Sequence, residues 1–192
     1  MKNLLRFFGF KNNRGMSTAI STLMTLTAAV ILTGSTVLYA TNVSTNAMAN
    51  EKMIMPTTHV WYINSTASVG GIVLTNSGTT DAIINKITIN GVNCAWAGNN
   101  SFILYNKTAG SFAGDLAFAD VKLANMTISI ANQPYEFQAA SEGISLKSGS
   151  SMALYIATPD NIMVYDMGQP ITVVVSTTQA IYTGQANVES PA

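Results

Sequence analysis

The chain has 192 residues, of which 48% are apolar and only 9% are charged, with one cysteine and one histidine. Soluble proteins usually carry about 25% charged residues, so Ser, Thr, Asn and Gly must cover much of this surface. One cysteine excludes an intramolecular disulfide framework, and with a single histidine it also excludes a Cys/His zinc site. This composition suits an exported or assembled protein better than a cytosolic enzyme.

The formal net charge of zero hides an asymmetry along the chain. Residues 1–15 carry four basic side chains and no acidic one, whereas the rest of the chain has five lysines and nine acidic residues. The body is therefore mildly acidic and contains no basic cluster. This distribution argues against a nucleic acid as partner.

Residues 16–40 form an apolar span that contains no charged residue. A helix of this length is about 37 Å long, which is enough to cross a hydrocarbon core of about 30 Å with some tilt. Nine of its residues are Ser or Thr, whose hydroxyls can bond back to a carbonyl one turn earlier. We expect the helix to continue with falling apolar density to residue 55 and to end before Pro56, because the residue before a proline disfavours the helical region.

The four cations that precede the span place residues 1–15 in the cytoplasm and the rest of the chain outside, by the positive-inside rule. Three interpretations compete for this segment. One is a secretory signal peptide cut after Ala47-Met48-Ala49, although the span is longer than an ordinary apolar signal region. Another is an uncut anchor that holds one extracellular domain.

The third interpretation follows from the junction Asn13-Arg14-Gly15-Met16, which places a basic residue and a glycine directly before the apolar run. This junction resembles the class III signal peptide of archaeal type IV pilins and archaellins. Bacterial pilins carry a glutamate at the fifth mature position, and Ile20 stands there in this chain, which points to the archaeal branch.

The resemblance implies a leader of residues 1–15, which a prepilin peptidase would remove by cutting after Gly15. It also implies a filament-core helix, identical subunits as partners, and a membrane-bound precursor that an assembly machinery takes up. Large apolar residues occur on all faces of such a helix, and small residues allow close helix approach. We expect the helix-packing positions to be Ala28, Ala29 and Gly34.

From residue 57 to residue 192 the apolar pattern changes to alternation, which is typical of half-buried strands. Asn90-Gly91 is the dipeptide that suits a type I′ hairpin turn. The fold class predicted is α+β: a long N-terminal apolar helix followed by an all-β head with an immunoglobulin-like sandwich topology and a frayed tail at 189–192. The predicted strands lie at residues 60–63, 71–75, 83–89, 102–105, 126–130, 152–156, 171–176 and 180–183.

The sequence predicts no catalytic site, cofactor or metal site. His59 has no motif partner, and Cys94 is interpreted as a small buried hydrophobe, with an intermolecular disulfide as the alternative. Neither Asp115 with Asp120 nor Asp160 with Asp166 has the spacing of an EF-hand loop.

Candidate N-glycosylation sites are Asn64, Asn99, Asn106 and Asn125, each in an Asn-x-Ser/Thr sequon. Asn99 and Asn106 flank a short predicted strand and are expected to be exposed. Asn42 also begins a sequon but is the least suited, because it lies near the expected helix bundle.

These observations favour a non-enzymatic structural subunit of an extracellular filament resembling an archaeal type IV pilus, with adhesion as its expected task. An archaellin of a swimming filament would need the same core and a similar head. The alternative from another class is a membrane-anchored extracellular binding module that never polymerises.

Overall fold

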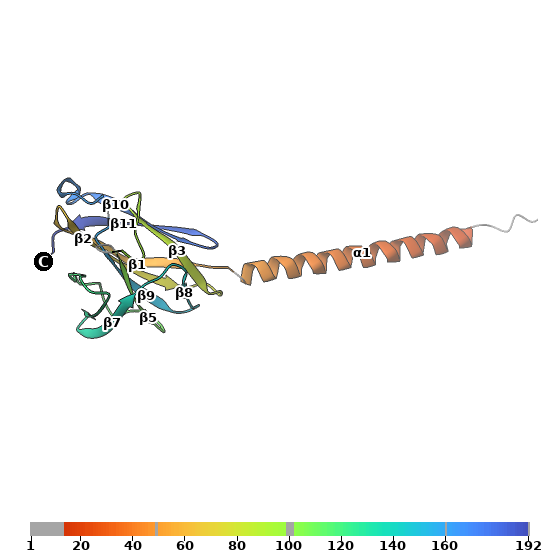
Figure 1. Cartoon of the computed structure of the whole chain (residues 1–192). Helices are drawn as coiled ribbons and strands as arrows, with labels where there is room; N and C mark the ends of the chain where they lie inside the picture. The colour runs from red at the N-terminus through yellow and green to blue at the C-terminus, as the bar shows by residue number, and fades with distance from the viewer. Residues whose placement is uncertain (1–13, 49, 99–101, 160, 192) are drawn as a thin grey trace, which may run out of the picture. The chain divides into compact units, whose positions relative to one another are not determined.

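The structure is a computed structural model that describes residues 14–48, 50–98, 102–159 and 161–191. Within the helix, side chains are described for residues 17–41. The chain divides into two compact units, Met1–Met48 and Ala49–Ala192. In the described part of the chain, the first unit contains one helix and the second contains the strands. An N-terminal apolar helix followed by a β domain is therefore confirmed (Figure 1).

Helix α1 spans Arg14–Met48, so it ends seven residues earlier than the sequence predicted. Residues 53–55 are already part of a strand. The reason is tertiary: the carbonyl of Asn50 accepts a hydrogen bond from Thr79, and the carbonyl of Lys52 accepts bonds from Ser77 and Gly78. These bonds hold the backbone after the helix against a turn of the β domain, in a conformation that a helix does not allow.

The described residues of the β domain form eleven strands and one short 3₁₀ helix, η1 (Val164–Asp166). All eight predicted strands coincide with observed ones, whereas β4, β7 and β8 were not predicted. The strands are β1 (Met53–Asn64), β2 (Ala67–Asn76), β3 (Ala82–Ile89), β4 (Val92–Asn93), β5 (Ile103–Thr108), β6 (Asn125–Ile130), β7 (Gln133–Ala139), β8 (Ile144–Leu146), β9 (Ser151–Ala157), β10 (Pro170–Thr177) and β11 (Ile181–Glu189).

The strands form one connected mixed sheet in the order β4-β3-β10-β11-β1-β2-β9-β5-β7-β6, with β8 beside β3. Among the strands of the described residues, β1 and β11 form the single parallel pair, with Val60 opposite Val188 and Trp61 opposite Glu189. Glu189 is thus part of the sheet, so the prediction of a frayed tail from residue 189 is wrong for that residue. The immunoglobulin-like strand order stays a prediction, because the strands belong to one sheet.

The predicted turn at Asn90-Gly91 is confirmed by its backbone. Asn90 has φ 48° and Gly91 has φ 81°, and positive φ at both central residues is what a type I′ turn requires. The turn connects β3 to β4, with Ile89 opposite Val92.

Two apolar clusters lie on opposite faces of the central strands β2 and β9. On β9, Met152, Leu154 and Ile156 belong to the first cluster, which also takes residues from β3, β10 and β11. Ala153 and Tyr155 point to the other face and belong to the second cluster, with residues from β6, β7 and the segment 109–124. Strand β9 is therefore buried on both faces, although its sequence predicted a half-buried strand.

Candidate functional site

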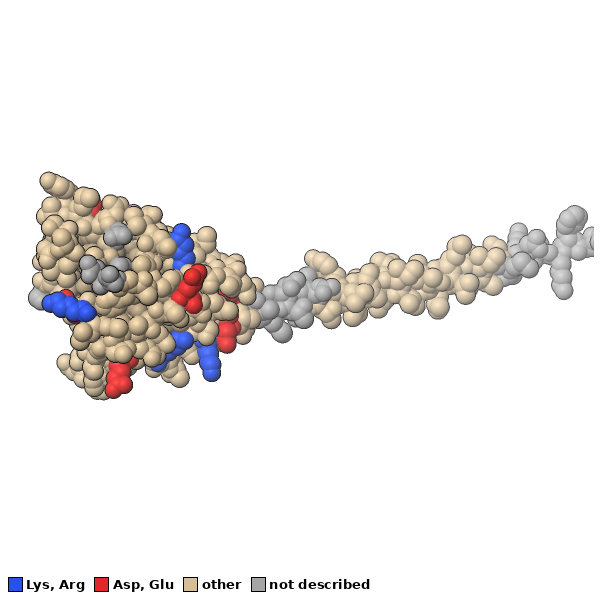
Figure 2. Space-filling model, in the orientation of Figure 1, with Lys and Arg blue, Asp and Glu red and all other residues tan. Residues whose placement is uncertain are grey.

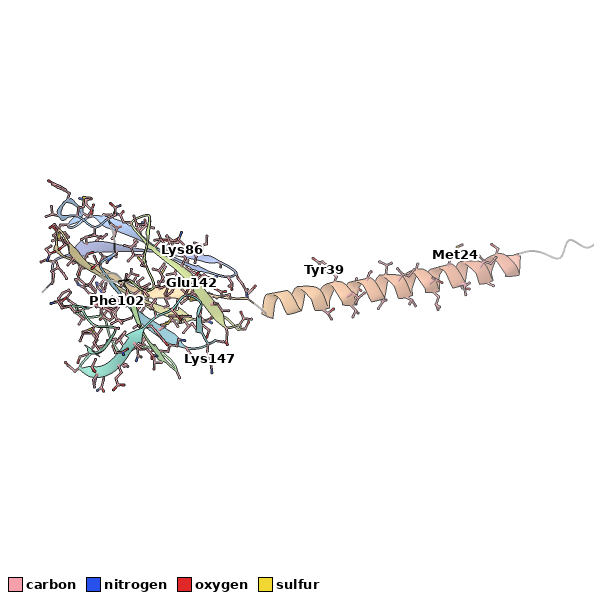
Figure 3. All side chains as sticks on the ribbon, viewed as in Figure 1. Met24, Tyr39, Lys86, Phe102, Glu142 and Lys147 are labelled. Atoms are coloured by element: carbon pink, nitrogen blue, oxygen red, sulfur yellow. The ribbon has the colours of Figure 1, made fainter. Side chains whose placement is uncertain are left out.

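The main candidate functional surface is the apolar span of α1, Ser17–Thr41. It is long and apolar enough to cross a membrane, by length and composition, and none of it is buried inside the structure. Met24 is 69% exposed and Tyr39 is 74% exposed, and both project outward from the helix in Figure 3. Figure 2 shows acidic and basic side chains on the β domain and none along residues 17–41, the part of the helix whose side chains are described.

Large apolar residues are distributed around this helix rather than along one stripe. At 100° per residue, Ile20, Ile31 and Leu38 share one direction, and Leu23, Val30 and Val37 point about a quarter-turn away. Leu32 and Tyr39 lie on a further side. An amphipathic helix with one buried face would show a single apolar stripe, so this helix requires an apolar environment on most of its circumference.

The hydroxyl groups of the span do not contradict that requirement, because they bond within the helix. Thr25 donates to the carbonyl of Ser21 at 2.8 Å, Thr27 to Leu23 at 2.8 Å, and Thr33 to Ala29 at 2.7 Å. Thr22, Ser35, Thr36 and Thr41 make bonds of the same kind. The predicted bonding of Ser and Thr to the preceding turn is confirmed, and it lowers the cost of placing these residues in an apolar medium.

The predicted packing positions Ala28, Ala29 and Gly34 all lie in this exposed part of the helix. A shallow apolar groove runs beside Ala29 and Gly34, bordered by Leu26, Val30 and Val37. A Cβ placed on Gly34 would meet no atom within 4 Å. The small residues therefore leave space that a ridge of another helix can fill.

The predicted leader junction lies at the beginning of α1. The backbones of Arg14, Gly15 and Met16 are helical. The rest of the leader, residues 1–13, lies outside the described residues, as do Ala49 of the alternative signal-peptidase triplet and Asp160 of one acidic pair.

The single histidine occupies a polar corner of the β domain. His59 on β1 places Nε2 2.9 Å from Oδ1 of Asp115 and Nδ1 3.6 Å from Oε2 of Glu189. Its ring stacks on Trp61 with a centroid distance of 5.2 Å. The sequence did not predict that these two carboxylates meet His59, because they lie 56 and 130 positions later and no local motif links them to it.

The geometry of His59 suits a structural role. Each ring nitrogen faces a different carboxylate, so the imidazole bridges the segment 109–124 and the end of β11. In catalysis, one of the two nitrogens would have to face a nucleophile or a substrate. The side chain of Asp115 is 67% exposed, so we expect the bridge to contribute little to stability.

The other candidate chemical groups have structural partners. Asp120 forms an ion pair with Lys122, and Asp166 accepts a 2.7 Å hydrogen bond from the backbone of Met163 at η1. Among the described residues, no group of three His, Cys, Asp or Glu side chains could hold a metal ion. Cys94 is 2% exposed within the first apolar cluster, which agrees with its interpretation as a buried hydrophobe.

Tyr155 is a titratable group at the centre of the sheet whose pKa is shifted by its surroundings. Burial raises the pKa of its phenol, and the negative charge of Asp115 raises that pKa further. The hydroxyl donates a 2.7 Å hydrogen bond to the carbonyl of Ala117. Tyr155 therefore ties the segment 109–124 to the centre of the sheet.

The sequons lie in different structural contexts. Asn64 is exposed at the turn between β1 and β2, and Asn125 is exposed at the start of the edge strand β6. Asn106 is half-buried inside β5, and its Nδ2 donates a 2.7 Å hydrogen bond to the carbonyl of Glu136. Asn99 lies outside the described residues, and Asn42 lies in α1, where its side chain is not described.

Comparison with known proteins identifies no family. No family model matches the chain, and no curated protein matches it. Among solved structures, the sporulation control protein Spo0M of Bacillus subtilis is similar over 73% of this chain, with 9% sequence identity and a TM-score of 0.28. The match spans about half of Spo0M, 49% of its chain, and a likeness this low carries no argument about function.

Proposed function

We propose that this chain is the structural subunit of an extracellular filament resembling an archaeal type IV pilus, and that it polymerises through α1. The observation that carries the proposal is the span Ser17–Thr41, in which all side chains are exposed and apolar residues occur around the helix. Such a surface requires cover by lipid or by other chains. In the precursor the cover is the membrane, and in the filament it is the helices of identical subunits.

The small residues of the helix support packing between copies. Lipid tails adapt to any helix surface, so a lone anchor has no need for a groove at Ala29 and Gly34. Tight helix association uses such grooves, because they allow the backbones to approach closely. The internally bonded hydroxyls leave few polar groups that would require water in a helix bundle.

The charge pattern supports removal of the leader before assembly. Residues 1–15 contain Lys2, Arg6, Lys11 and Arg14. Moving a charged side chain into an apolar bundle costs several kcal/mol. A cut between Gly15 and Met16 removes all four cations and leaves an uncharged N-terminal segment, apart from the new terminal amine.

The β domain would form the outer part of the filament and mediate adhesion. We include in this proposal an immunoglobulin-like sandwich, because β3, β10 and β11 share the first apolar cluster with β2 and β9. Residues 1–15 of the precursor would lie in the cytoplasm and the β domain outside the cell.

The decisive experiment is N-terminal mass spectrometry of the surface protein, combined with electron microscopy of filaments whose subunit is identified. The proposal requires an N-terminus at Met16, and Gly15→Val should leave an uncut, membrane-bound and unassembled precursor. An N-terminus at Asn50 would indicate an ordinary signal peptide and would overturn the proposal. An intact Met1 in the surface protein would indicate an anchored binding module instead.

A pilus and an archaellum share this subunit plan, so the same microscopy has to be combined with a swimming assay. Loss of attachment with normal swimming in a deletion strain supports the pilus. Loss of swimming with normal attachment would assign the chain to an archaellum.

A further inference from the structure

We propose that Asn64 is an N-glycosylated residue of this protein, modified at Nδ2 when the β domain is exported. The inference rests on the proposed function in one respect: the β domain must reach the compartment in which sugars are transferred. The three sequons whose side chains are described differ in backbone conformation, exposure and use of the amide nitrogen. Those differences select Asn64.

The first argument is local backbone structure. Asn64 ends β1, and Ser65 and Thr66 form the two-residue turn that leads into β2. All three residues of the sequon are exposed. A transferase has to surround the acceptor amide and the hydroxyl two residues later, and a protruding turn gives access to both.

The second argument is the hydrogen bonding of the sequon. Oδ1 of Asn64 accepts one bond from the backbone nitrogen of Thr66 and one from its hydroxyl, both at 2.9 Å. This arrangement is an Asx turn. It brings the Thr66 hydroxyl to the amide group of Asn64 and occupies only the oxygen, so that Nδ2, the atom that forms the new bond, is left for the sugar.

Asn106 has the opposite arrangement. It lies within β5, which is paired with β9 on one side and with β7 on the other. Its Nδ2 already donates to the carbonyl of Glu136. Modification would remove that bond and require a transferase to reach into a continuous sheet, so we expect Asn106 to stay unmodified.

Asn125 is exposed, but its sequon is extended. Residues 125–127 are paired with residues 136–138 of β7 along their whole length. The strand would have to leave its partner for the amide and the Thr127 hydroxyl to converge. Asn64 needs no such rearrangement, because its turn already brings the two groups together.

Within the β domain, Asn64 lies far along β1 from the residues at which the chain enters that domain. The chain enters the β domain at residues 50–53, and β1 then extends for eleven residues to Asn64, at most about 36 Å. A glycan on Asn64 therefore lies at the end of β1 opposite the point at which the chain enters. There it adds a hydrated polar cover to a domain with few charged side chains.

The chemical step is a glycosyl transfer with a lipid-phosphate-linked sugar as the donor. A bond forms between Nδ2 of Asn64 and the anomeric carbon of the sugar. The bond between that carbon and the phosphate oxygen breaks, and the lipid phosphate leaves with the electron pair. Nδ2 loses one proton to a base of the transferase, so no oxidant or reductant is involved.

The test is mass spectrometry of the full-length protein purified from the cells that make it, with intact masses and sequon peptides. The unaltered chain should carry a glycan on the peptide that contains Asn64. Asn64→Gln and Thr66→Ala should each lower the intact mass by one glycan, and Thr66→Ser should keep it at least in part. The matched control Asn106→Gln should leave the glycan mass unchanged.

An unmodified Asn64 in a protein whose N-terminus is Met16 would overturn this inference and leave the proposed function standing. A glycan on Asn106 or Asn125 with Asn64 unmodified would overturn it in the same way. An unmodified Asn64 in a chain that keeps Met1 and stays inside the cell would overturn both proposals. A glycan on Asn64 in a protein that forms no filaments would support this inference and contradict the proposed function.

Discussion

The backbone nitrogen of Lys52 lies 2.5 Å from the place that a Cβ on Gly78 would occupy. Gly78 also donates a 3.0 Å hydrogen bond to the carbonyl of Lys52, so the two backbones are in direct contact. Fully buried Asn76 supports the same turn, because its Nδ2 donates to the carbonyls of Thr80 and Leu146 and its Oδ1 accepts from Gly78. This contact fixes the backbone of the residues just before β1 against the turn that contains Gly78.

We therefore predict that Gly78→Ala destabilises the β domain by about 1–3 kcal/mol, since two backbones would have to separate. Denaturant unfolding of the full chain in detergent, followed by tryptophan fluorescence, measures this change, because Trp61 and Trp96 both lie in the β domain. Gly34→Ala in the helix is the matched control and should leave the midpoint of the unfolding transition unchanged. Equal free energies of unfolding for Gly78→Ala and the unaltered protein would contradict the close approach of the Gly78 and Lys52 backbones.

A second prediction concerns where the β domain begins. A chain that starts at Asn50 should be soluble, monomeric and rich in β structure, because it keeps the bonds from residues 50–52 to residues 77–79 and the buried Met53. A chain that starts at residue 57 loses both and should unfold at lower denaturant concentration. Circular dichroism and light scattering compare the two. Equal stability would show that residues 50–56 are not part of the domain.

A third prediction tests the helix as an assembly element. Ala29→Phe and Gly34→Phe should reduce filament formation strongly and leave membrane insertion unchanged, because lipid accepts a bulky apolar group and a tight helix bundle does not. Electron microscopy and membrane fractionation measure the two effects. Met24→Leu, which nearly conserves volume, is the control. Normal filaments from both phenylalanine variants would favour a lone membrane anchor.

A fourth prediction ranks the two contacts that hold the segment 109–124. Tyr155→Phe removes a part-buried hydrogen bond to the carbonyl of Ala117 and should cost about 1–2 kcal/mol. Asp115→Ala removes the contact with His59, and it should cost less than about 1 kcal/mol because Asp115 is mostly exposed. Equilibrium unfolding of both variants tests this order. A larger loss for Asp115→Ala would assign the main role to the histidine bridge.

A fifth prediction follows from the raised pKa of Tyr155. Above pH 10 the tyrosine of the unfolded chain loses its proton, whereas the folded one retains it, so the unfolded state binds fewer protons and stability falls as pH rises. From this one group, the free energy of unfolding falls by at most about 1.4 kcal/mol per pH unit. Unfolding free energies of the unaltered protein and Tyr155→Phe should therefore converge between pH 10 and 11.5. A constant difference across that range would contradict the prediction.

The sequence predicted strands and a turn correctly where their signal lies in residues that are close together in the chain. Alternation located β6, β9 and β10, and Asn90-Gly91 located a hairpin turn with positive φ at both residues. Strand β7 was not predicted, although Tyr135, Phe137 and Ala139 alternate with Glu136 and Gln138 in its sequence, and only Phe137 of its seven residues is buried. Its place is decided by pairing with β6 and by the second apolar cluster.

The candidate sites divide in the same way. Composition alone predicts the apolar span and locates its small residues, because an uncharged apolar run of that length is typical of a membrane-spanning helix. The sequence also identifies the sequons, but it does not predict which of them are exposed and which have an amide that is already hydrogen-bonded. Asn106 was expected to be exposed beside a strand, and it lies inside one with its amide bonded to Glu136.

The sequence by itself determined a long apolar helix followed by a β-rich domain, since helix length, hydropathy and strand alternation are properties of contiguous residues. The tertiary structure decided the end of that helix, through the contact of Lys52 with Gly78, and the burial of β9 on both faces. It also decided that His59 meets Asp115 and Glu189. These features join residues that lie 26 to 130 positions apart, and contacts across such separations are set by how the whole sheet packs, which no local pattern records.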